Sequence, residues 1–236
     1  MNKWLILCGV VLGGAVAALV SFQFLSRPVA SSPKILSPPV DIPALISKAQ
    51  TGNTRAQARL AGLYVTGEAG TNSYPLAVFW YRKAVEQGCA EAQLGLGELY
   101  ETGQGVAKDL PQAIKLYRQA AEQGLASAQY TLAFMQEAGR GLPQDQVEAS
   151  KWFRRAAEQG HSLSQYDLGQ RYDLGVGVPI DRVEALKWLI LAADQGQVDA
   201  GARRDQVEKE LTRTQITEAQ RRAKEYSSKK TPPRAK

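Results

Sequence analysis

The chain has 236 residues, of which 44% are hydrophobic and 22% charged, a balance typical of one or two globular domains. Residues 1–202 hold 18 basic and 18 acidic side chains, so the 11 basic and 5 acidic residues from Arg203 onward account for the whole net charge of +6. A neutral body with a basic tail argues against nucleic acid as the main ligand, and the two cysteines do not form a disulfide framework.

Residues 1–25 are predicted to form a signal-anchor or transmembrane helix. Residues 4–25 carry no charge, and at 1.5 Å per residue they would extend about 33 Å, enough to cross a hydrocarbon core of about 30 Å. A secretory signal cleaved after residues 15–17 is the alternative. We therefore expect a protein of the inner membrane facing the periplasm or exterior, or a secreted or periplasmic one after cleavage. Gly9 and Gly13 form a GxxxG pair through which two such helices could dimerise weakly.

Residues 26–43 are rich in proline and serine, which predicts a semi-extended linker. Residues 44–211 then repeat with a period of 36 residues, marked by a glycine at 52, 88, 124, 160 and 196. Regular spacing of this kind predicts a solenoid of stacked units. The units are residues 52–87, 88–123, 124–159 and 160–195, followed by a partial unit at 196–211. Positions within a unit are counted below from its first glycine.

Each unit predicts two helices, helix A and helix B, joined by a loop that contains a GxG pair such as Gly103/Gly105. Helix B begins at a capping signature such as Asp145…Glu148 and ends at the motif AAEQG, where glycine can adopt a left-handed conformation. The first unit departs from this pattern, with Ser73 in place of the capping Asp. Residues 212–226 are predicted to form a polar capping helix, and residues 227–236 a disordered basic tail.

Residues 92–124, AQLGLGELYETGQGVAKDLPQAIKLYRQAAEQG, resemble the Sel-one-like repeat, a relative of the tetratricopeptide repeat. Residues 164–196 show the same pattern, and the resemblance covers roughly residues 52–211. It implies an all-α fold, a right-handed α-solenoid of helix-turn-helix repeats. The transmembrane helix predicted above would precede this solenoid. It also implies a role as an adaptor or scaffold for other proteins.

No motif in the sequence indicates a catalytic or metal site. His161 is the only histidine and stands beside no repeating acid or cysteine, and no phosphate-binding loop, nucleophile elbow or HExxH is present. The carboxylates of AAEQG lie on successive helix ends and do not converge on one site. We therefore expect no enzymatic activity, no cofactor and no metal.

A candidate partner-binding surface lies on the side of helix A where the residues differ between units. At 100° per residue, positions 3, 6, 10 and 13 fall opposite the repeated Ala, Gln and Leu positions. Aromatic side chains among carboxylates suit a protein or peptide partner with basic character, although the aromatic residues could instead pack against a neighbouring repeat. The residues are Glu91, Leu94, Glu98, Glu101, Tyr130, Phe134, Glu137, Tyr166, Gln170 and Asp173.

The remaining repeated residues have a structural interpretation. Gln57, Gln93, Gln129 and Gln165, at position 5, are expected to bond backbone groups at the turns between units. Trp80, Trp152 and Trp188, at position 28, are expected in the core.

The predicted function is therefore that of a membrane-tethered, non-enzymatic adaptor for a protein partner. One alternative is an immunity protein that neutralises a secreted toxic enzyme in the cell envelope, because exported proteins of the resembled family include such members. Another is a peptidoglycan- or polysaccharide-associated regulator, for which exposed tryptophans would be needed.

Overall fold

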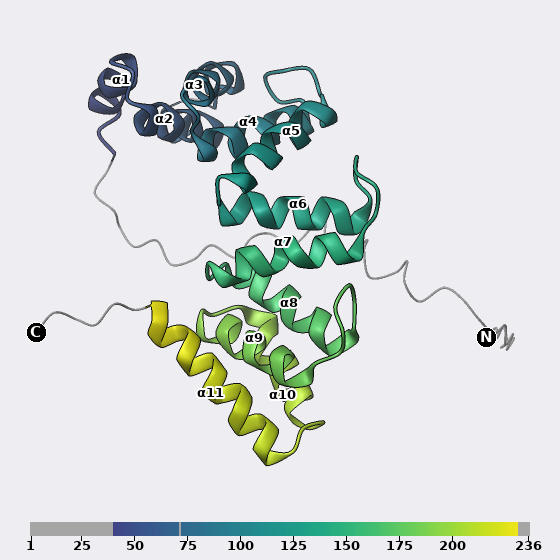
Figure 1. Cartoon of the computed structure of the whole chain (residues 1–236). Coiled ribbons are helices and arrows are strands. Elements are labelled where there is room, and N and C mark those ends of the chain that lie inside the picture. The colour runs from purple at the N-terminus through teal and green to yellow at the C-terminus, as the bar shows by residue number, and fades with distance from the viewer. Residues whose placement is uncertain (1–39, 71, 231–236) are drawn as a thin grey trace, which may run out of the picture. The chain divides into compact units, whose positions relative to one another are not determined.

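The computed structural model describes residues 40–70 and 72–230 (Figure 1). The predicted membrane segment 4–25, its alternative cleavage site, the Gly9/Gly13 pair, most of the linker and the end of the basic tail lie outside these residues. Within the described residues, no helix is long and apolar enough to cross a membrane.

The described part of the chain forms eleven α-helices and no β-strand, which confirms the all-α repeat fold. The helices are α1 (Ile42–Gln50), α2 (Thr54–Thr66), α3 (Tyr74–Glu86), α4 (Ala90–Thr102), α5 (Leu110–Glu122), α6 (Ala126–Ala138), α7 (Gln146–Glu158), α8 (Ser162–Leu174), α9 (Arg182–Asp194), α10 (Val198–Glu208) and α11 (Arg213–Lys230).

Helices α2, α4, α6 and α8 are the helix A of the four units, and α3, α5, α7 and α9 are the helix B. Each helix A packs against the helix B of its own unit, and each helix B packs against the helix A that follows, which produces the stack in Figure 1. Helix α1 begins at Ile42, inside the segment predicted as linker, with the Asp41 carboxylate accepting a hydrogen bond from Ala44 N. The stack therefore begins with a lone helix that packs on α2.

The predicted turn chemistry is present. Asp109, Asp145 and Asp181 cap helix B by accepting backbone N–H bonds, whereas Ser73 makes no such bond in the first unit. Gly177 has φ +67°, and a Cβ at this residue would overlap the Gln146 carbonyl oxygen. The loop after helix A therefore requires glycine both for its backbone angle and for its close approach to the preceding helix B.

The repeated glutamines connect successive units, as expected. In each unit, the amide oxygen of the position-5 glutamine accepts a hydrogen bond from a second glutamine 30 residues later in the chain. This second glutamine belongs to the AAEQG-like motif at the end of helix B. In three of the four units, the amide nitrogen of the position-5 glutamine also donates to a carbonyl oxygen of the preceding helix. The motif glutamine therefore has a structural role. The four amide pairs are Gln87–Gln57, Gln123–Gln93, Gln159–Gln129 and Gln195–Gln165, with distances of 2.6–2.8 Å.

The core contains the position-8 leucines Leu60, Leu96, Leu132 and Leu168, all buried. The prediction for the tryptophans is confirmed for Trp188, which is 3% exposed. Trp80 and Trp152 are only half-buried and lie at the edges of their hydrophobic clusters. Of the three tryptophans at position 28, only Trp188 is therefore a core residue.

The C-terminal end of the stack departs from the repeat. The predicted capping helix begins with a capping box, in which Thr212 N donates to Gln215 Oε1 at 2.9 Å and Gln215 N donates to Thr212 Oγ1 at 3.3 Å. Helix α11 then continues to Lys230, so residues 227–230, predicted as disordered tail, are helical. This helix packs against α9 (Figure 1).

Candidate functional site

The ten predicted partner-binding residues lie on α4, α6 and α8, and the structure divides them into paired and exposed groups. Three of the five carboxylates, all at position 13, bind arginines that follow them in the chain. Glu101 Oε1 pairs with Arg140 Nη1 at 2.8 Å, Glu137 Oε1 pairs with Arg171 Nη2 at 2.5 Å, and Asp173 pairs with Arg203. These acids join neighbouring units.

Asp173 requires a correction. Its carboxylate is only 7% exposed and also lies 3.4 Å from Arg182 Nε, so it is an internal ion-pairing group and not part of an open groove. Helical projection places it on the variable side, but α10 and the start of α9 cover that side at the end of the stack. Buried carboxylates persist where cations compensate their lost hydration, as Arg182 and Arg203 do here.

Two of the three predicted aromatic residues pack inside the stack. Tyr130 contacts Phe153 edge-to-face with ring centroids 5.7 Å apart, and its ring lies 5.0 Å from that of His161. Tyr166 is half-buried against the cluster that contains Leu186. Tyr130 and Tyr166 therefore pack against neighbouring repeats, which was the alternative to partner binding. They lie beneath the variable surface of helix A.

Phe134 is different, because its side chain is 46% exposed on the middle of α6. Tyr130 and Glu137 lie four residues before it and three residues after it, so all three share one face of the helix. An exposed aromatic side chain on a scaffold of packed helices is typical of a binding anchor.

The charged centre of this region is Arg171, which the prediction missed. Position 11 is Leu63, Leu99 and Met135 in the first three units, but Arg171 in the fourth. The Arg171 side chain is only 4% exposed and lies over the Phe153 ring, with its guanidinium carbon 4.6 Å from the ring centroid. A guanidinium thus occupies a core position.

The surrounding sequence has changed to accommodate Arg171. Position 26 is Val78, Ile114 and Leu186 in three units and Ser150 in the third. Arg171 Nη1 donates to Ser150 Oγ at 3.0 Å and to Gln146 Oε1 at 3.2 Å. The arginine and the serine together replace an apolar contact between helix B and the next helix A.

Asp167 completes the centre. It accepts a hydrogen bond from the Tyr130 hydroxyl. Burial, together with the charge of Glu137, raises the pKa of Asp167 to about 7, although Arg171 and Tyr130 act in the opposite direction. Burial lowers the pKa of Arg171, which nevertheless remains charged at neutral pH. Two carboxyl groups therefore share one guanidinium.

A cavity of about 90 Å³ opens at this point between α6 and α8. Leu174, at its rim, is well exposed. The lining includes Gln170, which the sequence predicted, and Asp167 and Arg171, which it did not. In the sequence, the only sign of Asp167 and Arg171 as site residues was the change from an apolar residue to arginine at position 11 of the fourth unit. The cavity is lined by Glu137, Asp167, Gln170, Arg171, Leu174 and Val176. We call Tyr130, Phe134, Glu137, Asp167, Gln170 and Arg171 the α6–α8 site.

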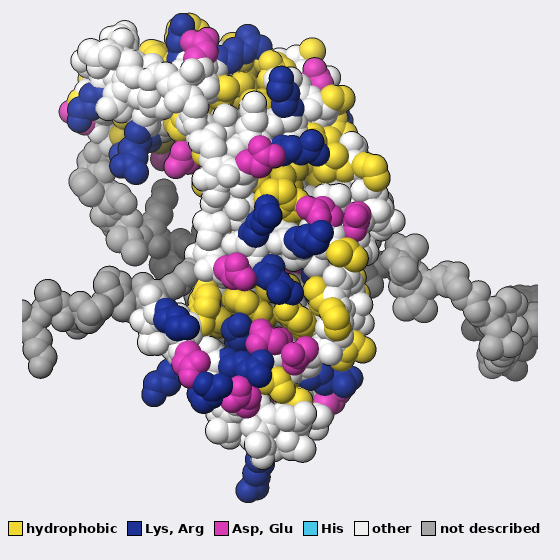
Figure 2. Space-filling view, in the orientation of Figure 1, with side chains coloured by type: hydrophobic (Ala, Val, Ile, Leu, Met, Phe, Trp, Pro, Cys, Tyr) yellow, Lys and Arg dark blue, Asp and Glu magenta, His cyan; other side chains and the backbone are white. Residues whose placement is uncertain are grey.

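On α4, Glu91 and Glu98 remain exposed, and Leu94 packs into the cluster around Tyr117. Partial loss of hydration and the nearby charge of Glu101 raise the pKa of Glu98. The face seen in Figure 2 carries basic and acidic side chains interspersed with hydrophobic ones. The excess of acids on α4 and α6 is therefore a local feature.

No group of three or more His, Cys, Asp or Glu side chains that could hold a metal ion occurs in residues 40–70 and 72–230. His161 caps α8, with its Nδ1 2.9 Å from Ser164 Oγ.

Comparison with known proteins agrees with this architecture. The model of the Sel1 repeat family matches four consecutive segments, residues 54–89, 90–125, 126–161 and 162–197. These have the period expected from the sequence and begin two residues after the predicted unit boundaries. No curated protein matches the chain.

Two solved structures are similar in both sequence and fold. A protective antigen of uropathogenic Escherichia coli, which displays an SLR fold, is 35% identical over 80% of this chain and 40% of its own, with a TM-score of 0.70. A Sel1 repeat protein from Oxalobacter formigenes is 34% identical over 70% of this chain and 48% of its own, with a TM-score of 0.67. The chain thus spans less than half the length of either protein.

An immunity protein from Pseudomonas aeruginosa is 22% identical over 74% of this chain and 80% of its own, with a TM-score of 0.39. A likeness at this level carries no argument about function.

Proposed function

Because the chain belongs to the Sel1 repeat family, whose scaffold is suited to protein–protein interaction, we propose that it is a non-enzymatic adaptor that binds a partner protein through the α6–α8 site. The observation that carries the proposal is the 46% exposed side chain of Phe134. The equivalent residues in the other units are Gly62, Glu98 and Gln170, so the repeat itself does not require an aromatic residue here. A large apolar side chain that packing does not need is available to a partner.

The charge of the surface indicates the character of that partner. The α6–α8 site holds two carboxyl groups and one guanidinium, and the exposed Glu91 and Glu98 lie on the preceding helix A. A partner segment with an apolar side chain for Phe134 and a basic side chain for these acids would complement the surface. Such a basic group would also favour the ionised form of Asp167.

The test is to recover partners of the full chain by crosslinked pull-down and then to measure their binding to variants. Phe134→Ala combined with Glu98→Lys is expected to weaken partner binding by about tenfold or more, in the range of interface hot spots. Val147→Ala, which removes an exposed apolar side chain from helix B, is the matched control and should change the affinity less than about twofold. Failure to recover a protein partner, or unchanged binding of the double variant, would contradict the proposal.

We propose further that residues 4–25 tether the adaptor to the inner membrane, with its repeats facing the periplasm or exterior. The length and the lack of charge of this segment support the proposal. Deletion of residues 1–25 is expected to move the protein from the membrane fraction to the soluble fraction, and protease added to spheroplasts should digest the repeats of the full chain. Soluble full-length protein, or repeats that resist protease until the membrane is broken, would contradict it.

A further inference from the structure

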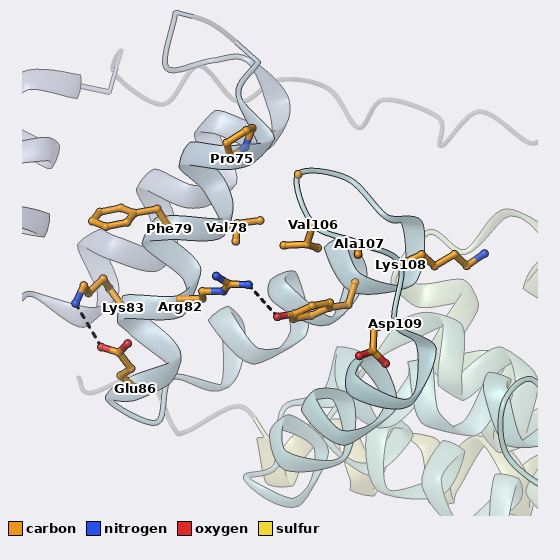
Figure 3. Close-up of a pocket in the computed structure, with 12 residues that line it drawn as sticks. Pro75, Val78, Phe79, Arg82, Lys83, Glu86, Val106, Ala107, Lys108 and Asp109 are labelled. Carbon is orange, nitrogen blue, oxygen red and sulfur yellow. Dashed lines mark hydrogen bonds and ion pairs between the residues drawn. The ribbon is translucent and has the colours of Figure 1, made fainter.

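A second surface lies on helix B of the first unit, on α3, away from the α6–α8 site in the sequence and in the stack. A pocket of about 670 Å³ is open between α3 and the loop that joins α4 to α5 (Figure 3). Phe79, which is 50% exposed, lies on α3 at this pocket, and Leu76 beside it is also exposed. Val106 lines the pocket from the loop, and the buried Val78 lies at its floor on α3.

The pocket is also basic. Arg82, Lys83 and Lys108 line it, together with Glu86 and Asp109. Lys83 lies 3.6 Å from Glu86, and Asp109 caps α5, so these acids have roles within the chain. Arg82 Nη2 donates to the neutral Tyr100 hydroxyl at 3.0 Å (Figure 3). This hydrogen bond holds the guanidinium at the pocket without neutralising its charge.

The same groove recurs one unit later. A pocket of about 360 Å³ lies on α5 at the equivalent residues, 36 positions further along the chain. Ile114, Lys115, Arg118 and Leu142 there replace Val78, Phe79, Arg82 and Val106. The groove is therefore a product of the repeat geometry, and its chemistry varies between units.

On α9, the helix B of the fourth unit, a helix of the same chain covers the equivalent face. Helix α11 packs on α9, and Arg222 Nη1 pairs with Glu184 Oε1 at 2.7 Å. Four residues of α11 share hydrophobic clusters with four residues of α9. By the repeat spacing, these four α9 residues occupy the same positions as Pro75, Val78, Arg82 and Lys83 of α3. The α11 residues are Ile216, Ala219, Ala223 and Tyr226, and the α9 residues are Val183, Leu186, Ile190 and Leu191.

We propose that the α3 groove docks an amphipathic helix of a protein partner, with apolar side chains placed on Phe79 and an acidic side chain placed on Arg82. The packing of α11 on α9 shows that this face of helix B accepts a helix where no GxG loop follows the next helix A. Beside α3 that loop is present, between α4 and α5, and forms one wall of the groove. The two helices B differ in charge at the docking face. Where α9 has Glu184, which pairs with Arg222 of α11, α3 has the uncharged Leu76. Where α9 has the apolar Ile190, α3 has Arg82. A basic helix suits α9, and an acidic helix suits α3.

The probes are two labelled peptides of residues 213–230, each held helical by a staple on its outer face. One has the natural sequence, with six basic and two acidic side chains, and the other carries Arg221→Glu, Arg222→Glu and Lys224→Glu, which leaves three basic and five acidic side chains. Binding to the full chain is measured by fluorescence anisotropy. The acidic peptide is expected to bind about tenfold more tightly than the natural one, and Phe79→Ala in the chain is expected to weaken it by about tenfold.

Arg82→Glu provides the decisive comparison, because it should reverse the preference of the groove so that the natural, basic peptide binds more tightly than the acidic one. Phe79 and Arg82 are exposed, and circular dichroism checks that both variants remain folded. Phe134→Ala is the control and should leave peptide binding unchanged, which separates this groove from the α6–α8 site. Absence of saturable binding of the acidic peptide, equal affinity for both peptides, or an unchanged preference in Arg82→Glu would overturn the proposal.

Discussion

At the scale of single residues, the most informative position is Arg171, a charged side chain in a site that is apolar in the other units. Removing a guanidinium from water is costly, and it is tolerated here because Ser150, Gln146 and Glu137 bond it on several sides. Removing one member of such a group leaves the others buried without a partner. Replacing the whole group with apolar residues restores ordinary packing.

The first prediction is a double-mutant cycle at this contact. Arg171→Leu alone should destabilise the protein by about 2–4 kcal/mol at neutral pH, because Glu137, Asp167 and Ser150 lose their cation or donor. Arg171→Leu with Ser150→Ile restores the apolar character of the Met135–Ile114 pairing in the preceding unit. It should recover the part of the loss that comes from Ser150, while Glu137 and Asp167 still lack their cation. Urea unfolding measures both values. Additive single effects would show that the two residues are not coupled.

The second prediction concerns the pH dependence of stability. Burial and Glu137 raise the pKa of Asp167 from its ordinary value of 3.8 to about 7 in the folded protein. Between these values the folded state binds more protons than the unfolded state, so this group lowers the free energy of unfolding as pH rises from 4 to 7, and its full penalty applies above pH 7. Asp167→Asn should therefore be more stable than the natural protein at pH 8 and show no such gain at pH 4.

Denaturant unfolding at pH 4, 6 and 8 measures this dependence. Glu148→Gln on the surface of α7, paired with Lys151 at 2.8 Å, is a matched carboxylate-to-amide control and should show little change across the range. An equal stability difference between Asp167→Asn and the natural protein at all three pH values would contradict the assignment of a raised pKa to Asp167.

At the scale of the helices, capping and glycine loops define each unit, and the glutamine pairs connect the end of helix B to its own helix A. The fifth helix A, α10, lacks the GxG loop that follows helix A in units two to four. After Lys209–Leu211 the chain enters α11 directly, and this helix lies along α9 with Tyr226 Oη donating to the Ala157 and Glu158 carbonyl oxygens at 2.9 Å. A change in one loop thus converts the next helix B into a cap.

The third prediction tests the contact between α9 and this cap. Trp188 is 3% exposed and packs edge-to-face on Tyr226 with ring centroids 5.5 Å apart. Trp188→Ala should therefore cost about 3–5 kcal/mol through the cavity that it leaves. Trp80→Ala, at the equivalent but half-buried position, should cost less. A change below about 1 kcal/mol for Trp188→Ala in denaturant melts would contradict its assignment to the core.

At the scale of the whole molecule, the described helices form two layers with different surfaces. The helix A layer carries Phe134 and the acids of α4 and α6, and the helix B layer carries the two apolar and basic grooves on α3 and α5. In a stack in which each unit contacts only its neighbours, changes on one surface leave the other largely unaffected. The variants Phe134→Ala and Phe79→Ala should therefore act independently, the first on the proposed protein partner and the second on the docked helix.

The sequence alone determined the period, the order of the helices, the position of the turns and the burial of the position-8 leucines. These follow from contacts that recur at a constant spacing, so a single chain shows them through internal comparison. It also predicted that Phe134 lies on the variable side of helix A, and the side chain is 46% exposed there. Residues that packing does not require vary between units.

Only the tertiary structure decided which polar groups meet across units and where the last helix packs. Glu137 pairs with Arg171, and Asp173 with Arg203, at separations in the chain that differ from the 36-residue period. Those pairings depend on how far one helix is rotated and shifted against the next, which no local pattern encodes. For the same reason, helical projection assigned Asp173 to an open groove, although α9 and α10 bury it.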